Sequence, residues 1–169
     1  MASDFGYSKH PDETFSIWDK EKVLSQTIER IRQFKPDIII NRFDHRTPGK
    51  THGHHTSSAI ISTEAFELSG SKNALSISEI WQPKRLFFNT SWWFYGSREK
   101  FNKSDKYNLI EVDSGVYDPL TERSNSEIAA MSRSQHKSQG FGSAAQQGRQ
   151  VEYLELIKGT PLKSNNPFE

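Results

Sequence analysis

Three histidines lie close together in the run His52-Gly53-His54-His55. Imidazole is a common zinc ligand and a common catalytic acid, because its pKa lies near neutrality. Two imidazoles three residues apart, His52 and His55, can converge on one point when they lie in a loop that leads into a helix. Solvated loop histidines often show the same spacing, so the pattern alone is weak. The run predicts a site only if the elements around it hold the side chains in a cleft.

The chemistry that such a run could perform is zinc-assisted hydrolysis. A catalytic zinc usually takes about three protein ligands and keeps a further position for water. The bound water ionises near neutral pH and can attack a carbonyl group. A nearby imidazolium can stabilise the oxyanion or protonate the leaving amine. His52 and His55 could divide this work, and the positive end of a helix dipole favours the neutral, metal-binding imidazole.

Local signals predict the elements that position the histidines. Apolar residues at helical spacing predict a helix over 20–34, with Asp19 as its N-cap and Pro36 as its stop. Around the run the sequence predicts three further elements: a buried strand over 37–43, a loop over 44–51 and a helix over 56–68. Because ligands of parallel α/β sheets bind beyond the carboxyl ends of the strands, this placement favours a site.

Later segments predict more elements of the same kind: strands over 85–89 and 107–112, a helix from the capping box at 124–127 to about 135, and an element over 151–157 that could be a strand or a helix. Segments 1–15 and 96–106 read as polar turns and loops. The order helix, strand, helix, strand, strand, helix predicts a layered α/β domain with a mostly parallel sheet.

Composition limits the function classes. The chain has 169 residues, of which 33% are hydrophobic, and a formal net charge of +1, which argues against a dedicated binder of nucleic acid or anionic membranes. There is no cysteine, so disulfide scaffolds, thiolate zinc sites and a Cys nucleophile are excluded. The longest aliphatic run is far shorter than the ~20 residues of a spanning helix. The start lacks the features of a signal peptide, so the compartment stays open between the bacterial cytoplasm and export by an upstream signal.

Two motifs occur in order along the chain. Pro36-Asp37-Ile38-Ile39 precedes the run at 52–55, and His136-Lys137-Ser138-Gln139 follows far downstream. This arrangement resembles the PIG-L/LmbE-like family of zinc-dependent N-acetylglucosamine de-N-acetylases, in particular its large bacterial branch. In that family an H-P-D-H motif follows a strand that ends in Pro-Asp and hydrophobic residues, and an H-x-[ST]-Q motif comes later. The resemblance covers residues 4–153 and implies a Rossmann-like three-layer fold.

The resemblance also implies roles for several candidate site residues. It makes His55 the metal ligand and His52 the catalytic acid or oxyanion stabiliser. His54 stands where the family has an Asp, next to the ligand, where it would affect how His52 is oriented and charged. The resemblance places His136 and Gln139 beside the active-site cleft as substrate-binding residues. By their position between the strand and the run, rather than by the resemblance, Arg42 could bind substrate and Asp44 could orient a catalytic histidine.

The family's A-H-P-D-D motif, which supplies two zinc ligands and the general base, has no good match. The nearest sequence, His10-Pro11-Asp12-Glu13, follows no apolar strand and reads as a turn that begins a helix. The resemblance therefore implies a partial deacetylase domain over 1–158, without its N-terminal strand–helix units, and a tail over 159–169. Zinc, or another divalent metal, would be incompletely coordinated by this chain alone, and the missing half is a candidate partner. We expect negligible activity and marginal stability of the isolated chain.

The expected function is that of part of a zinc-dependent hydrolase that removes an acetyl group from an N-acetylated amino sugar or its conjugate. The alternative is a non-catalytic, truncated or degenerate domain that binds carbohydrate or a protein partner. Some residues leave two interpretations open. The run 92–95, Trp-Trp-Phe-Tyr, could be a sugar platform, although core packing is the simpler interpretation. Arg42, Arg46 and Asp44 could act at the site or be solvated loop charges.

Overall fold

The computed structural model describes residues 2–72, 76–140 and 142–169, except for the side chain of Gln139. By its packing the chain divides into two compact units. The first unit comprises residues 1–110 and 154–169, and the second comprises residues 111–153. The histidine run and both of its flanking elements belong to the first unit.

Helices α1 (Pro11–Ile17) and α2 (Lys20–Phe34) precede the first strand of the first unit, and helix α3 (Gly53–Ser69) follows it. The prediction for α2 is confirmed at both ends. The side chain of Asp19 accepts from the Lys22 N–H at 3.0 Å, and Lys35 ends the helix in the left-handed conformation just before Pro36. Helix α1 lies in a segment that was predicted to be turn-like, with a turn at 10–13 that begins a helix.

Helix α3 begins earlier than the sequence predicts, so the histidines form its N-cap and first turn. The reason is a long-range cap. The carbonyl of Ser8 accepts the Gly53 N–H at 2.8 Å, and the Ser8 hydroxyl accepts the His54 N–H at 3.2 Å. The close approach also requires glycine, because a Cβ at position 53 would lie 2.3 Å from the His10 carbonyl oxygen.

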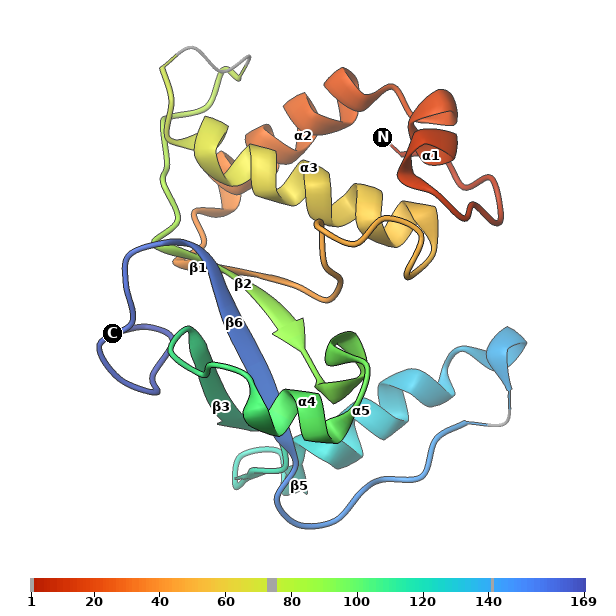
Figure 1. Ribbon diagram of the computed structural model, residues 1–169, viewed down its shortest axis with the longest axis vertical. Coiled ribbons are helices and arrows are strands. Elements are labelled where there is room, and N and C mark those ends of the chain that lie inside the picture. Colours follow the sequence, from red (N-terminus) through yellow and green to blue (C-terminus); the bar gives the residue numbers. More distant parts are fainter. Residues whose placement is uncertain (1, 73–75, 141) are drawn as a thin grey trace. The chain divides into compact units, whose positions relative to one another are not determined.

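Helices α2 and α3 lie side by side, and between them lies a small core of Ile28, Ile31 and Ala65 (Figure 1). Ile39 of the first strand and Trp81 pack against this cluster. The strand β2 contributes two fully buried apolar side chains, Leu86 and Phe87. The core therefore joins the two helices to the sheet and holds the start of α3 beside the end of the first strand.

A four-stranded sheet underlies these helices, in the order β1 (Ile38–Asn41), β2 (Arg85–Thr90), β6 (Val151–Gly159) and β3 (Leu109–Asp113). Strands β1 and β2 pair in parallel, with Asn41 opposite Phe88. The α/β class is confirmed. The prediction of a mostly parallel sheet is wrong, because β6 runs the other way: its end bonds to the start of β2, where the Thr160 N–H donates to the Lys84 carbonyl at 3.0 Å.

The direction of β6 follows from the path of the chain. Between β3 and β6 the chain makes its excursion through the second unit and returns where it left, since the Ser114 N–H donates to the Gln150 carbonyl at 2.7 Å. A strand that re-enters at the same end must run antiparallel to the strand that left. Parallel pairing needs a crossover to the opposite end.

The edge position of β1 corrects a second expectation. The sequence predicts a buried strand, but β1 is the edge strand of the sheet that the described residues form, and Ile40 is 49% exposed. One face of the strand packs on the helices through Ile39. The three consecutive isoleucines therefore do not indicate burial on both faces.

The residues after β6 pack against the start of β2. The buried guanidinium of Arg85 donates to the carbonyls of Thr160, Pro167 and Pro161 at 2.9, 2.8 and 3.1 Å. These bonds satisfy the charged group without a carboxylate and fasten the C-terminal residues to the first unit. The predicted boundary between 158 and 159 stays a prediction.

The remaining short elements of the first unit are the 3-10 helix η1 (Trp92–Tyr95) and helix α4 (Arg98–Lys103), which lies in a segment predicted to be a loop. The second unit holds β4 (Tyr117–Asp118), β5 (Arg123–Ser124), α5 (Asn125–Ser134) and η2 (Lys137–Gln139). The predicted capping box is confirmed, because the Ser124 hydroxyl accepts the Glu127 N–H while the Glu127 carboxylate accepts the Ser124 N–H.

Candidate metal and substrate site

The three histidines of the run converge in space. One ring nitrogen of each of His52, His54 and His55 lies within 4.8 Å of the others. In the part of the chain that the structure describes, this is the one group of three or more histidine or acidic side chains close enough to share a metal ion. The convergence follows from the early start of α3, which places all three residues in a single turn.

Aromatic contacts hold His52 and His55 in place. The His55 ring stacks on Phe43, the second residue after β1, with ring centroids 3.9 Å apart. The His52 ring stacks on His55 at 4.9 Å, and Tyr7 meets the outer side of His52 edge-on at 5.0 Å. Residues from three separate segments thus build one ladder of rings at the carboxyl end of β1.

A buried serine holds His54. The Ser8 hydroxyl lies 3.4 Å from His54 Nδ1 and 2.8 Å from the Thr14 hydroxyl, and Ser8 is almost wholly buried. The same hydroxyl caps the His54 N–H, as described above. Because Nδ1 faces this serine, Nε2 is the ring nitrogen left for a metal.

The environment keeps His55 neutral. Burial lowers the pKa of the His55 imidazole below its usual value, and the neighbouring His54 and His52 rings lower it further. A neutral imidazole has a free lone pair at pH 7, which is the form that binds a metal.

The three imidazoles fit a zinc ion by chemistry and by proximity. Zinc accepts three neutral histidines and one open position, and a chain without cysteine offers no thiolate in competition. Nitrogens bound about 2.0–2.1 Å from a tetrahedral zinc would stand roughly 3.3 Å apart, so the rings would have to close in slightly from their present separation.

A pocket of about 470 Å³ opens beside His52 and His55. Its other lining residues come from the loop after β1 and from the segment after β2: Arg42, Phe43, Lys50, Thr51, Ser91, Trp93 and Phe94. The volume falls within the ~300–1,000 Å³ typical of small-molecule sites. The pocket mixes aromatic side chains with two cations and two imidazoles.

Sequence reasoning missed several of these residues, among them Lys50 and Phe43, and undervalued Trp93. Lys50 and Phe43 carried no signal of their own. Trp93 was taken as a core residue, yet it is 46% exposed and lines the pocket. The useful signal was positional: the Trp-containing run follows β2 directly, and β2 pairs in parallel with β1, so the carboxyl ends of the two strands meet.

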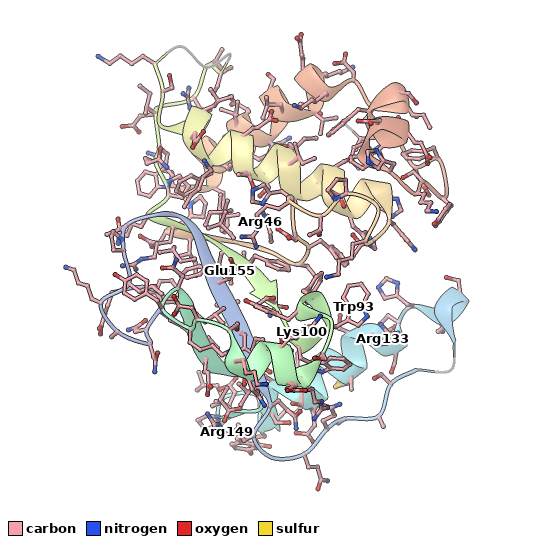
Figure 2. The ribbon with its side chains drawn as sticks, in the orientation of Figure 1. Arg46, Trp93, Lys100, Arg133, Arg149 and Glu155 are labelled. Atoms are coloured by element: carbon pink, nitrogen blue, oxygen red, sulfur yellow. The ribbon has the colours of Figure 1, made fainter. Side chains whose placement is uncertain are left out.

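Asp44 lies in an adjoining cavity of about 250 Å³ rather than in solvent. Its side chain is 7% exposed and accepts from Arg46 Nε at 2.8 Å. Arg46 also makes a two-bond pair with Glu155 of β6, at 2.9 and 2.8 Å, and Figure 2 shows the two side chains turned toward each other. Within the described residues no hydrogen bond joins Asp44 to a histidine of the run. The Asp44–Arg46–Glu155 network instead fastens the loop to the sheet.

The remaining candidates lie elsewhere. His10 acts as the N-cap of α1, where its Nδ1 accepts the Asp12 N–H at 3.4 Å, and Pro11 occupies the first helical position. The segment is thus a helix start, as the sequence indicated. His136 and Gln139 lie at η2 in the second unit, and the Gln139 side chain is outside the described residues. Their assignment to substrate binding stays a prediction.

Comparison with known proteins gives little guidance. No family model matches the chain, and the comparison with curated proteins finds no match. One similar solved structure is described as the conserved protein TT1542 from Thermus thermophilus, with 15% sequence identity and a TM-score of 0.43. The match covers 88% of this chain, which spans 62% of the length of that protein. No helix among the described residues combines the length and the apolar character needed to cross a bilayer.

Proposed function

We propose that the histidine pocket is the zinc and substrate site of a hydrolase that removes an acetyl group from an N-acetylated amino sugar or its conjugate. The observation that carries the proposal is the convergence of His52, His54 and His55 beside a pocket of small-molecule size that His52 and His55 line. A zinc ion held there would polarise the amide carbonyl and lower the pKa of a bound water.

The three imidazoles would divide the work. His55, neutral and half-buried against Phe43, is suited to bind the metal. His54 is a second donor, because Ser8 occupies its Nδ1 side and orients its ring. His52 is the exposed ring of the three and lines the pocket, so it can meet the substrate and protonate the leaving amine.

Trp93 would position the sugar. An exposed indole beside the imidazoles offers a flat apolar face to a sugar ring, whose polar groups can then reach the cations of the pocket. This assignment turns the sugar-platform interpretation of the Trp-containing run into a specific residue.

A carboxylate base is missing from the described site. Neither an Asp nor a Glu is among the residues that line the pocket, and Asp44 is bonded to Arg46. General base catalysis typically contributes about 10²–10⁴-fold to the rate. We therefore propose that any hydrolysis by this chain is slower than that of a site with a carboxylate base by a factor of that size.

Relationship to the PIG-L/LmbE-like family, and a Rossmann-like layout, form part of the same proposal. It is supported by the parallel β1–β2 pair, the histidines at the carboxyl end of β1 and the helix that starts there. These features match the place that the family's H-P-D-H motif would occupy.

The test is acetate release from N-acetylglucosamine conjugates by protein loaded with one equivalent of zinc. The proposal expects slow release that depends on zinc and is lost in His55→Gln. The matched control is His10→Gln, a histidine outside the cluster, which should keep the activity. Release at the same rate after zinc removal would contradict the proposal.

A second candidate function is carbohydrate binding without hydrolysis, favoured by the lack of a carboxylate at the described pocket. It predicts that an amino-sugar conjugate binds equally well with and without zinc and that no acetate appears during prolonged incubation. Binding that tightens with zinc and is followed by acetate release would favour the hydrolase.

A further inference from the structure

Thr90, the last residue of β2, carries a buried hydroxyl that the fold leaves without a hydrogen bond. The residue is 1% exposed, and its Oγ1 is the one buried side-chain nitrogen or oxygen in the described part of the chain that has no hydrogen-bond partner. Such a group destabilises the folded state, so proteins rarely keep one unless water or a ligand meets it. Thr90 lines the cavity of about 250 Å³ that also holds Asp44, here called the Thr90 cavity. The unpartnered hydroxyl therefore belongs to a space that an occupant can fill.

Three aromatic rings border the Thr90 cavity. Phe88 and Thr90 are two residues apart on β2, so their side chains lie on the same face of the strand. The 3-10 helix η1 adds Phe94 and Tyr95. The Phe94 ring packs edge-on against Phe88, with ring centroids 4.8 Å apart. Aromatic faces carry partial negative charge and attract cations, so these walls favour an occupant that is cationic and partly apolar.

The charged groups that line the cavity sum to one negative charge. Asp44 and Glu155 are acids, and Arg46 is the one base among the lining residues. Arg46 donates to both carboxylates, at 2.8 Å to Asp44 and at 2.9 and 2.8 Å to Glu155. Two lysines, Lys50 and Lys106, lie over aromatic rings of η1 but do not line the cavity. Each ionised carboxylate can accept about four hydrogen bonds, so both acids keep acceptor capacity beyond their bonds to Arg46.

The lining therefore selects a ligand that brings both hydrogen-bond donors and positive charge. A primary ammonium has three N–H donors and one charge. A quaternary ammonium lacks the donors, and an alcohol lacks the charge. The field at Tyr95 is consistent with this choice. Burial raises the pKa of the Tyr95 hydroxyl above its usual value, and the Glu155 carboxylate raises it further.

We propose that the Thr90 cavity binds a small primary amine in its ammonium form. The ammonium group would lie between the two carboxylates and the Thr90 hydroxyl, with the alkyl part against Phe88 and Phe94. The volume of about 250 Å³ is several times the ~30 Å³ that one water occupies in the liquid, so the space suits a ligand of a few heavy atoms. Binding there needs neither zinc nor hydrolysis, and it goes beyond the function proposed for the histidine pocket.

The test is an NMR chemical-shift titration of zinc-free protein, at constant ionic strength, with n-propylammonium, tetramethylammonium and n-propanol. We expect n-propylammonium to bind at least about tenfold more tightly than either of the other probes, because only it combines charge with N–H donors. The shifts should be saturable and should include the amide of Thr90. Equal affinity for n-propanol, or no saturable shift with the amine, would overturn the proposal.

Thr90→Val gives a result that a purely structural threonine would not. It removes the unpartnered hydroxyl with little change of shape, so the melting temperature of the ligand-free protein should rise by roughly 2–4 °C while the affinity for n-propylammonium falls about tenfold. Thr90→Ser keeps the hydroxyl and should keep the affinity.

The matched control is Thr63→Val. Thr63 is also buried, but its hydroxyl donates to the Ala59 carbonyl at 2.7 Å and the residue does not line the cavity. This variant should bind the amine as the unchanged protein does, and its melting temperature should not rise. An equal loss of affinity in Thr63→Val, or an unchanged affinity in Thr90→Val, would contradict the site.

Discussion

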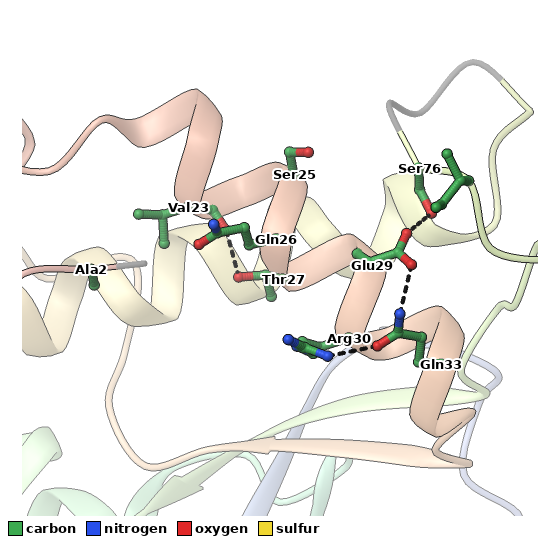
Figure 3. Close-up of a pocket in the computed structure, with 10 residues that line it drawn as sticks. Ala2, Val23, Ser25, Gln26, Thr27, Glu29, Arg30, Gln33 and Ser76 are labelled. Atoms are coloured by element: carbon green, nitrogen blue, oxygen red, sulfur yellow. Dashed lines mark hydrogen bonds between the residues drawn. The ribbon is translucent and has the colours of Figure 1, made fainter.

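Two pockets in the first unit differ in how fully their polar side chains are hydrogen-bonded. The larger, of about 950 Å³, runs along α2, and the smaller, of about 470 Å³, lies beside the histidines. In the larger groove the polar side chains bond to one another. Figure 3 shows this series of hydrogen bonds. The Glu29 carboxylate accepts from Ser76 at 2.6 Å and from Gln33 at 2.7 Å, and the Gln33 side chain accepts from Arg30 at 2.7 Å.

The histidine pocket has the opposite character. Its imidazoles contact one another and Phe43 through ring faces, and its cations use only part of their donors. Size therefore favours the groove on α2, while chemistry favours the smaller pocket. Polar groups that the fold holds in place but does not fully bond are therefore a better guide to a candidate site than volume is.

The largest expected effect is on metal binding. His55→Gln should lower zinc affinity at least about 100-fold, because it removes the neutral donor at the centre of the ring ladder. Glu29→Gln, in the α2 groove, should leave zinc affinity unchanged. Calorimetry with zinc measures both. An equal loss of zinc affinity in the two variants would show that the histidine pocket is not the zinc site.

The second effect concerns the residue that holds His54. Ser8→Ala removes the partner of the His54 N–H and of Nδ1, so zinc affinity should fall about tenfold and unfolding free energy by about 1 kcal/mol. Ser16→Ala is the control, since the Ser16 hydroxyl is exposed and donates to the Glu13 carbonyl, far from the histidine run in the sequence. Urea unfolding and zinc titration check the pair. Unchanged zinc affinity in Ser8→Ala would show that His54 is not a donor.

A smaller effect is expected at the aromatic wall. Trp93→Ala should weaken binding of an N-acetylglucosamine conjugate about fivefold, because an aromatic contact is worth roughly 0.5–1.5 kcal/mol. Zinc affinity should stay the same, because the indole is not a metal donor. Calorimetry with the conjugate and with zinc measures both affinities. A loss of zinc affinity would show that Trp93 holds the histidines in position instead of contacting the sugar.

The smallest effect belongs to the groove on α2 and is a pH dependence of stability. Hydrogen bonds from Ser76 and then Ser78 lower the pKa of Glu29 from 4.5 to about 2. A carboxyl whose pKa is lower in the folded state stabilises the fold above its unfolded pKa, and this contribution is lost as the pH falls from 4.5 through 2. Glu29→Gln should flatten the fall in melting temperature over that interval. An identical acid profile in both proteins would show that the groove's internal bonds are weaker than described.

Local signals predicted some elements well. Helix α2 was predicted to the residue, because its cap, its apolar spacing and its terminating proline all lie within the segment itself. The capping box of α5 was equally local. The early start of α3 could not be predicted, since its cap comes from Ser8, which is 46 residues from His54 in the sequence but adjacent to it in space.

The direction of β6 and the composition of the pocket also depend on contacts between residues that are distant in the sequence. Strand direction depended on where the chain returns from the second unit, which no local pattern encodes. The histidines were found from their spacing, but Lys50 and Phe43 reach the pocket through the path of a loop that Arg46 fastens to Glu155. Sequence thus predicted which residue types could act, and only tertiary contacts showed what surrounds them.

Zinc X-ray absorption of the purified chain, after equilibrium dialysis against one equivalent of zinc, tests the central claim most directly. The account predicts one zinc per chain, with two or three imidazole nitrogens at about 2.0–2.1 Å and oxygen in the remaining position. A variant with His52, His54 and His55 all replaced by Gln should retain no zinc. Zinc held without imidazole ligands, or retained equally by that variant, would contradict the account.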